Sequence, residues 1–231
     1  MNPFVNKKWL CIELPQTAYR AAWKLQTDLV TARRENIVDT DVVLLLEHPP
    51  VFTLGRRGGL ENLTVAEDVL KDRGIPIIQV ERGGNITFHG PGQLVIYPIV
   101  DLKSARLGVA DYVEMLEEVV IRVAADWGIT GVRNPLNRGV WVGNRKLASV
   151  GVAVRRGISF HGVALNVNLS LDPFTWINPC GLKGIGVTSL EKELGGSVPM
   201  DPVRKAVKRH LKDVFGVDLV MTEIEELPID D

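Results

Sequence analysis

Apolar residues along the chain follow two kinds of spacing, which together predict intermixed helices and strands. The clearest helical spacing covers residues 108–127, where apolar side chains recur every three or four positions. Residues 41–47 are instead a continuous run of Val and Leu between two acids, which is typical of a strand buried on both faces. The same criteria predict further strands at 9–14, 51–54, 75–80, 94–100, 139–142, 147–154 and 159–169. They predict further helices at 17–36, 64–73, 189–194 and 201–215.

Turn residues divide these elements, and no low-complexity linker separates them. Short turns at 143–145 and 156–157 favour antiparallel hairpins between residues 139 and 169. Thr64 is expected to cap the helix at 64–73, with Glu67 as its capping-box partner. The last ten residues, 222–231, hold five acids and no base, and we expect them to form a solvated tail. The mixture of elements predicts an α+β, or mixed α/β, fold in a single domain, residues 1–231.

The composition narrows the classes of function. The 231 residues are 45% hydrophobic and 24% charged, which excludes a largely disordered chain. Lys and Arg number 27 against 28 Asp and Glu, so the net charge of −1 gives no argument for binding nucleic acid or an anionic membrane. Two cysteines, Cys11 and Cys180, exclude a disulfide scaffold and suit a reducing compartment. No apolar run has the length of a signal peptide or a membrane span, so we expect a cytoplasmic protein.

A Gly-rich run at 82–93, RGGNITFHGPGQ, is the first candidate for a binding site. Four glycines and one proline in twelve residues are more than a strand held only by packing requires, and glycine lets a backbone approach a ligand closely. Thr87 and His89 alternate with Ile86 and Phe88, so a short strand here would present both polar side chains on one face. The plainer interpretation is a hairpin with tight turns at both ends. The run contains neither of the glycine motifs that bind nucleotide phosphates.

Cys180 and Lys146 are the candidate catalytic residues. Cys180 lies in an irregular Asn-Pro-Cys-Gly loop where a thiol is accessible, whereas Cys11 lies in an apolar strand and is expected to be structural. A thiolate is a nucleophile, and a neighbouring ammonium lowers the pKa of a thiol. A desolvated lysine can also act as a base. Either role requires Lys146 to lie near Cys180 in the fold; otherwise Lys146 is a solvated turn residue.

The four histidines are scattered and lack the paired spacing of a zinc site, so we expect no metal. His161 lies in a strand-like alternation and is either a hydrogen-bonded structural residue or one that assists at a site. His48, before two prolines, is expected to be structural. His210 lies in a basic helical segment and is expected to be exposed.

Four motifs in a fixed order, with one further segment before them, give a resemblance to a known family. The Gly-rich run is followed by LVIYPI, by RKLASVG, by FHG-x-A-L-N-x-N and by INPCG, and HPPVFTLGRRG at 48–58 precedes them. Together these motifs resemble the octanoyltransferases of lipoate biosynthesis. The resemblance implies a fold like the catalytic domain of biotin and lipoate protein ligases, with a mixed sheet packed against helices and a core at about 38–220.

The resemblance also implies an activity and its partners. Enzymes of this kind transfer an octanoyl group from octanoyl-acyl carrier protein to a lysine of a lipoyl domain. The acceptors would be the E2 subunits of 2-oxoacid dehydrogenases and the H protein of glycine cleavage. Thioester exchange and amide formation need no ATP, so the resemblance implies no cofactor.

The resemblance assigns roles to individual positions. Cys180 would carry an acyl-thioester intermediate, and Lys146 would assist it, with His161 as a further assisting residue. Three segments would bind the acyl substrate, and they comprise Arg82, Gly83, Gly84, Asn85, Ile86, Thr87, Phe88 and His89, then Ser149, Val150 and Gly151, and finally Gly162, Val163 and Ala164.

Other functions remain open at this stage. An ATP-dependent lipoate protein ligase of the same fold would need ATP and free acid but not Cys180. A lipoyl or octanoyl amidotransferase would also use a cysteine, and a non-catalytic module that binds lipoyl domains would not need one. A papain-like hydrolase is disfavoured because only His210 follows Cys180. The basic helix that holds Arg204, Lys205, Lys208, Arg209 and Lys212 is either a solvated face or a docking surface for acidic partners.

Overall fold

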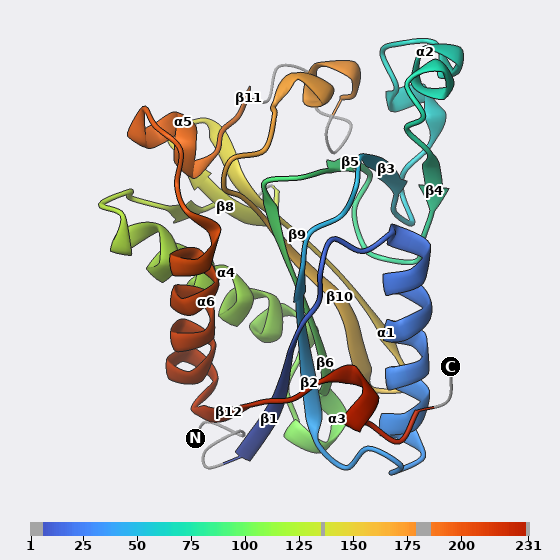
Figure 1. Ribbon diagram of the computed structural model, residues 1–231, viewed down its shortest axis with the longest axis vertical. Coiled ribbons are helices and arrows are strands. Elements are labelled where there is room, and N and C mark those ends of the chain that lie inside the picture. Colours follow the sequence, from blue (N-terminus) through green and yellow to red (C-terminus); the bar gives the residue numbers. More distant parts are fainter. Residues whose placement is uncertain (1–6, 135–136, 179–185, 230–231) are drawn as a thin grey trace.

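The centre of the molecule is a large mixed β-sheet (Figure 1). The structure, a computed structural model, describes residues 7–134, 137–178 and 186–229. Within those ranges the strand order is β12-β1-β2-β6-β10-β9-β8-β7, with β11 beside β9. The strands are β1 (Lys7–Glu13), β2 (Asp41–Leu46), β6 (Gln93–Asp101), β7 (Val132–Arg133), β8 (Gly139–Val142), β9 (Arg145–Arg155), β10 (Ile158–Asn166), β11 (Gly186–Val187) and β12 (Val217–Met221).

The strand directions divide this sheet into two parts. β12, β1 and β2 are parallel, and α1 forms the helical crossover from β1 to β2. From β2 through β6, β10, β9 and β8 to β7 every neighbouring pair is antiparallel. The two hairpins predicted between residues 139 and 169 are therefore confirmed.

Helices cover both faces of the sheet, and this explains the continuous apolar run in β2. Val43 and Leu45 pack with α4 (Val109–Asp126) and α6 (Met200–Phe215) on one face. Leu44 and Leu46 pack on the other face, where α1 (Tyr19–Arg34) lies. Figure 1 shows α1 on the opposite side of the sheet from α4 and α6. All six residues of β2 are buried, as the pattern predicted.

A second, smaller sheet lies beyond one end of the large one (Figure 1). It has the order β4-β3-β5, with β3 (Val51–Leu54), β4 (Ile77–Gln79) and β5 (Ile86–His89). Phe52, Phe88 and Phe174 form its apolar core, together with Leu70 of α2 (Glu67–Asp72). Two 3-10 turns, η1 (Leu60–Asn62) and η2 (Asp172–Trp176), lie beside this sheet. The junction of the two sheets is where the site described below forms.

Every strand and helix predicted from spacing is present, with shifts of a few residues at the ends. Sequence spacing missed β12, which is five residues long and belongs to the sheet only through its pairing with β1. It also missed the short elements β7, β11 and α3 (Leu102–Ala105). The predicted helix at 189–194 is α5 (Leu190–Leu194), and the hydroxyl of Ser189 accepts a hydrogen bond from the Lys192 N–H as its cap.

Two predictions were wrong. Thr64 does not cap α2, which begins at Glu67 after Ala66; the Thr64 hydroxyl donates instead to the Thr175 carbonyl, 3.0 Å away, in an extended pairing with the chain near η2. The end of the chain is also not a simple solvated tail. Its described acids are exposed, but Leu227 is buried and packs in the apolar cluster beneath α1.

No helix in the described ranges is both long enough and apolar enough to cross a membrane.

Candidate active site

A cavity of about 570 Å³ opens at the junction of the two sheets. Its walls come from the loop before β5, from β5 itself, from the β9–β10 ladder and from the first turns of α4. Nearly all of the predicted site residues that the structure describes line it. They are Arg82, Gly83, Gly84, Asn85, Ile86, Thr87, His89, Lys146, Ser149, Val150, Gly151, His161, Gly162, Val163 and Ala164.

Phe88 is the predicted binding residue that does not line the cavity. Side chains alternate along β5, so Phe88 points away from Thr87 and His89. Its ring packs against Phe52 and Phe174, with ring centroids 5.1 and 5.9 Å away. The structure therefore places Phe88 in the core of the small sheet.

Two of the predicted binding segments, distant in sequence, are directly paired in the β9–β10 ladder. Ser149 lies opposite Ala164, Val150 opposite Val163, and Gly151 opposite Gly162. Their common position on the antiparallel hairpin explains why both segments line one wall. The sequence predicted the hairpin and the two binding segments as separate features. The register of β9 with β10 shows that the two segments lie side by side in that hairpin.

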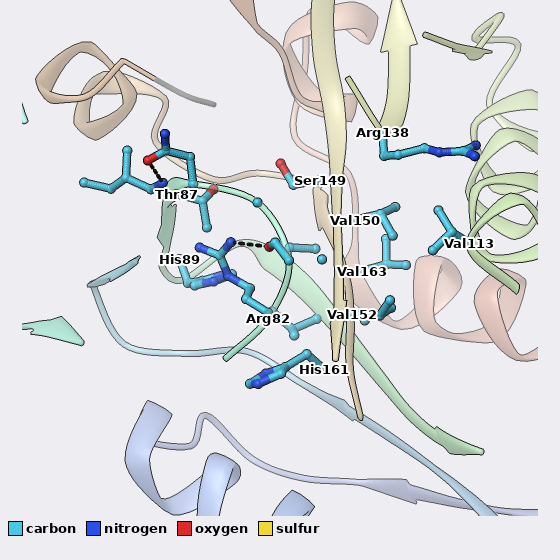
Figure 2. A pocket seen from close by; sticks show the side chains of 18 of the residues that line it. Arg82, Thr87, His89, Val113, Arg138, Ser149, Val150, Val152, His161 and Val163 are labelled. Atoms are coloured by element: carbon cyan, nitrogen blue, oxygen red, sulfur yellow. Dashed lines mark hydrogen bonds between the residues drawn. The ribbon is translucent and has the colours of Figure 1, made fainter. Parts of the chain in front are cut away.

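The Gly-rich loop at 82–85 crosses this wall at close range. The Gly83 N–H donates to the Val152 carbonyl of β9, 2.9 Å away. A Cβ atom at Gly151 would lie only 3.1 Å from the Arg82 Cδ and the Gly83 carbonyl oxygen, so glycine permits this approach. Figure 2 shows Arg82 lying between the loop and β9, with its guanidinium toward His89. The loop thus forms part of the cavity wall.

Lys146 is buried at the start of β9, only 5% exposed, and is not a solvated turn residue. Its ammonium donates to the Asn137 Oδ1, 2.7 Å away, and lies 5.4 Å from the centroid of the Trp141 ring. Its backbone pairs with Val187 of β11, and its carbonyl accepts the Thr188 N–H at 3.0 Å. A buried ammonium at the wall of a cavity is available to act on a group bound there.

The other candidate catalytic residue, Cys180, lies outside the described residues. The chain before it is anchored by the Asn178 N–H, which donates to the Asn62 carbonyl at 2.7 Å. The Asn62 side chain in turn donates to Asn85 Oδ1, 3.1 Å away on the cavity wall. Cys11 is fully buried, and burial raises the pKa of its thiol to about 12, which confirms that this cysteine is structural.

The sequence did not predict two tyrosines that also line the cavity, Tyr19 and Tyr97. Tyr19 Oη lies 3.5 Å from His161 Nδ1, and Tyr97 Oη lies 2.8 Å from His48 Nε2. A signal for Tyr97 was present, because a buried tyrosine in an otherwise apolar strand usually has a partner for its hydroxyl. Tyr19 lies at the start of a helix and gave no comparable signal. Arg57, Val113, Asn137 and Arg138 are further lining residues that the sequence did not single out.

His48, His89 and His161 are buried beside the cavity, and burial is the largest cause of lowered pKa values in all three. The pKa of His48 falls to about 4, although the Thr17 carbonyl, 2.7 Å from its Nδ1, opposes the shift. His48 is structural, as predicted. Burial also lowers the pKa of His161, and Glu81, 3.8 Å from its Nε2, opposes this shift by favouring the charged form.

The lowered pKa of His48 predicts a loss of stability in mild acid. An unfolded histidine has a pKa near 6.5, so the unfolded chain binds more protons than the native one between about pH 6.5 and 4. The free energy of unfolding should fall as the pH drops through that window, by up to about 3 kcal/mol from His48 alone. His48→Gln should reduce the fall, measured by urea unfolding at pH 7.5 and pH 5. Equal pH dependence in the variant and the wild type would contradict this account.

The basic helix does not present a free positive face. Arg204 pairs with Glu47 at 3.3 Å, and Lys208 pairs with Glu13. Arg209 and Lys212 pair with Asp126 and Asp218. His210 is not exposed as predicted, because its ring packs against α4 and its Nε2 lies 2.8 Å from Asp126 Oδ2. With most of its charges paired within the chain, α6 gives little support to a docking role.

No cluster of three or more His, Cys, Asp or Glu side chains suited to a metal ion occurs in the part of the chain that the structure describes.

Comparisons with known proteins identify the family of this chain. A family model described as "Lipoyl protein ligase A/B catalytic domain" matches residues 18–212. The octanoyltransferase of Desulfotalea psychrophila is 45% identical over 94% of this chain and 98% of its own length. The octanoyltransferase of Syntrophobacter fumaroxidans is 46% identical over 96% of this chain and 98% of its own length. These relatives confirm the predicted resemblance to octanoyltransferases, which are acyltransferases.

Solved structures agree on the fold. A lipoate-protein ligase A bound with ATP superposes with a TM-score of 0.75 at 19% identity, over 96% of this chain and 90% of its own. A bipartite lipoate protein ligase from Thermoplasma acidophilum, described with its E2 lipoyl domain, gives a TM-score of 0.74 at 19% identity, over 96% of this chain and 88% of its own. The predicted fold, a mixed sheet packed against helices as in lipoate ligases, is therefore confirmed.

Proposed function

Because the chain belongs to the lipoyl protein ligase A/B catalytic domain family, we propose that it transfers an octanoyl group from octanoyl-acyl carrier protein to a lysine of a lipoyl domain. The observation that carries the proposal is the cavity in which a buried lysine, Lys146, meets the three acyl-binding segments. The curated relatives named octanoyltransferase support the octanoyl group as the one transferred.

The reaction proceeds in two acyl transfers. The Cys180 thiolate attacks the carbonyl carbon of the octanoyl thioester, the bond to the carrier sulfur breaks, and the carrier leaves as a thiol. The amine of the acceptor lysine then attacks the new thioester, an amide forms, and the Cys180 thiolate is regenerated. In this scheme the Lys146 ammonium stabilises the Cys180 thiolate and gives its proton to the departing carrier sulfur. The neutral Lys146 amine that results then takes the proton that the acceptor amine loses.

The anchors of the chain around Cys180 support this role. Asn178 precedes Cys180 by two residues in the sequence. Asn178 is held by Asn62, which is bonded to Asn85 on the cavity wall. The chain returns from Cys180 at β11, where Val187 lines the cavity and pairs with Lys146. Both described ends are thus attached to the wall that the proposal requires.

The octanoyl chain needs apolar contacts, and a group of valines supplies them. Val150 and Val163 are partners in the β9–β10 ladder, and Val113 of α4 faces them across the cavity (Figure 2). Val152 and Val109 extend this apolar wall. Each buried methylene contributes about 0.8 kcal/mol, so partial burial of an eight-carbon chain gives several kcal/mol of binding free energy.

The experiment that tests the function compares acyl donors. The purified enzyme is mixed with an apo lipoyl domain and with either octanoyl-acyl carrier protein alone or free octanoate and ATP. The proposal predicts octanoylation of the lipoyl domain from the carrier protein without ATP. Acylation that appears only with free octanoate and ATP would assign the chain to the ligase reaction instead. A lipoyl domain whose acceptor lysine is replaced by arginine is the control and should stay unmodified.

A further inference from the structure

Six buried polar groups form one continuous hydrogen-bonded chain behind the cavity. It begins in the Gly-rich loop, passes through the small sheet, crosses to the large sheet and ends just after β11. Every residue in it is at most 8% exposed. The contacts are Arg82 Nη2 to Thr53 Oγ1 (2.8 Å), Thr53 Oγ1 to His89 Nε2 (3.3 Å), His89 Nδ1 to Gln93 Oε1 (2.7 Å), Gln93 Nε2 to Asn166 Oδ1 (2.9 Å) and Asn166 Nδ2 to the Thr188 carbonyl (2.9 Å).

The chemistry of the two ends orients the bonds of this Arg82–Thr188 hydrogen-bonded chain. A guanidinium can only donate, so the Thr53 hydroxyl accepts from Arg82 and its proton is free for His89 Nε2. At the other end the Thr188 carbonyl can only accept, so the Asn166 amide donates to it.

The same reasoning orients the middle of the chain. With its NH₂ on Thr188, Asn166 presents its oxygen to Gln93, whose NH₂ donates both there and to the Phe88 carbonyl at 3.3 Å. The Gln93 oxygen therefore faces His89 Nδ1 and accepts from it. The Gln93 oxygen requires a proton on His89 Nδ1, and the Thr53 hydroxyl has a proton to give to Nε2, so the contacts on both sides fit a neutral ring protonated on Nδ1. Burial, which is the largest cause, and the nearby Arg82 charge lower the pKa of His89 well below its usual value, in agreement with a neutral ring.

The two amides at the centre join the small sheet to the residue that follows β11. Gln93 begins β6 and Asn166 ends β10, and they are direct partners in that antiparallel ladder. Neither side chain lines the cavity. Gln93 bonds to His89 of the small sheet, which connects to Arg82 through Thr53. Asn166 bonds to Thr188, the residue after β11, whose N–H donates to the Lys146 carbonyl.

We propose that Gln93 and Asn166 are positioning residues, which hold the Gly-rich loop and β11 in a fixed relation across the cavity. The proposal rests on the proposed function, in which the loop binds the acyl group and β11 holds Lys146. Displacement of one wall by about 1 Å would cost up to about a hundredfold in rate, because the reacting groups are aligned by both walls.

The state of His89 tests the chain without any substrate. Long-range ¹H–¹⁵N correlation spectra of the ¹⁵N-histidine-labelled enzyme at pH 7 report which ring nitrogen carries the proton, and His89→Gln assigns the signals. The proposal predicts a neutral His89 ring protonated on Nδ1. A ring protonated on Nε2, or on both nitrogens, would overturn the directional chain whatever reaction the enzyme catalyses.

A pair of matched substitutions tests the positioning role. Asn166→Asp removes the donor to Thr188, whereas Asn168→Asp, two residues along, removes only a donor to the Val198 carbonyl. Asn166→Asp should lower kcat for octanoyl transfer by about tenfold or more, with a smaller change in KM for the donor. Asn168→Asp should stay within about twofold of the wild type. Equal losses in the two variants would overturn the proposal.

A second break at the opposite end gives an independent readout. Thr53→Val keeps the shape of the side chain but interrupts the chain between Arg82 and His89. If the Arg82–Thr188 hydrogen-bonded chain acts as a unit, the double variant Thr53→Val with Asn166→Asp should lose less kcat than the product of the two single fold-losses. Independent, multiplicative losses would contradict the proposal. If the enzyme transfers no octanoyl group, the proposed function is refuted. The His89 spectrum would still test the Arg82–Thr188 hydrogen-bonded chain, because it needs no substrate.

Discussion

Cys180→Ala should lower the rate of octanoyl transfer by at least about a thousandfold, because the variant has no thiol to form the acyl-enzyme. The measurement is transfer from octanoyl-acyl carrier protein to a lipoyl domain in single-turnover conditions. Cys11→Ala provides the matched control, since Cys11 is fully buried in the core between β1 and the helices of one face. That variant should keep a rate near that of the wild type. A Cys180→Ala enzyme with wild-type rate would show that the acyl group passes directly between the two proteins.

Lys146→Met should slow formation of the acyl-enzyme by about a hundredfold or more and move its pH dependence upward. Methionine fills a similar volume beside Trp141 but removes the ammonium that lies 2.7 Å from Asn137 Oδ1. Without that charge the Cys180 thiol ionises at higher pH, so the rate should still rise where the wild-type rate has levelled off.

Lys208→Met is the control for this experiment. Lys208 lies on α6, is paired with Glu13 and does not line the cavity. Its replacement tests whether loss of a lysine charge at a distance has any effect on the rate. A rate of acylation that is unchanged in Lys146→Met between about pH 6 and pH 9 would exclude Lys146 from the reaction.

The fold was predictable where side-chain spacing alone determines the element. The apolar stripe of α4, the doubly buried run of β2 and the turns of the β8–β9–β10 hairpins are local patterns, and all three appear in the structure. The failures are non-local. β12 is held by its pairing with β1, more than two hundred residues earlier in the chain, and Thr64 uses its hydroxyl on Thr175 rather than on its own helix.

The candidate site was predictable as a set of segments but not as an arrangement. The motifs placed Lys146 and the three binding segments in sequence, and the register of β9 with β10 brought two of them together. Tyr19 and the valines of α4 join the cavity through packing between elements, which single-sequence patterns do not report. Phe88 shows the converse, because it shares a motif with His89 yet faces the opposite side of its strand.

The proposed reaction, from an octanoyl thioester to a lysine amine, does not require a phosphate-binding loop. The acyl group arrives already activated as a thioester, so the cavity has to bind the chain, exchange one sulfur for another and deliver the carbonyl to an amine. The proposed reaction assigns those tasks to an apolar wall of valines, to the buried Lys146 and to the Cys180 thiol.

The central claim, an octanoyl thioester on Cys180, is tested most directly by intact-protein mass spectrometry. The wild type and Cys180→Ser are each incubated with octanoyl-acyl carrier protein in the absence of ATP and of lipoyl domain. The account predicts an added octanoyl mass on the wild type that neutral hydroxylamine or an added lipoyl domain removes. Cys180→Ser should show no adduct that hydroxylamine removes. An adduct that persists in hydroxylamine, or the same labile adduct on both proteins, would contradict the account.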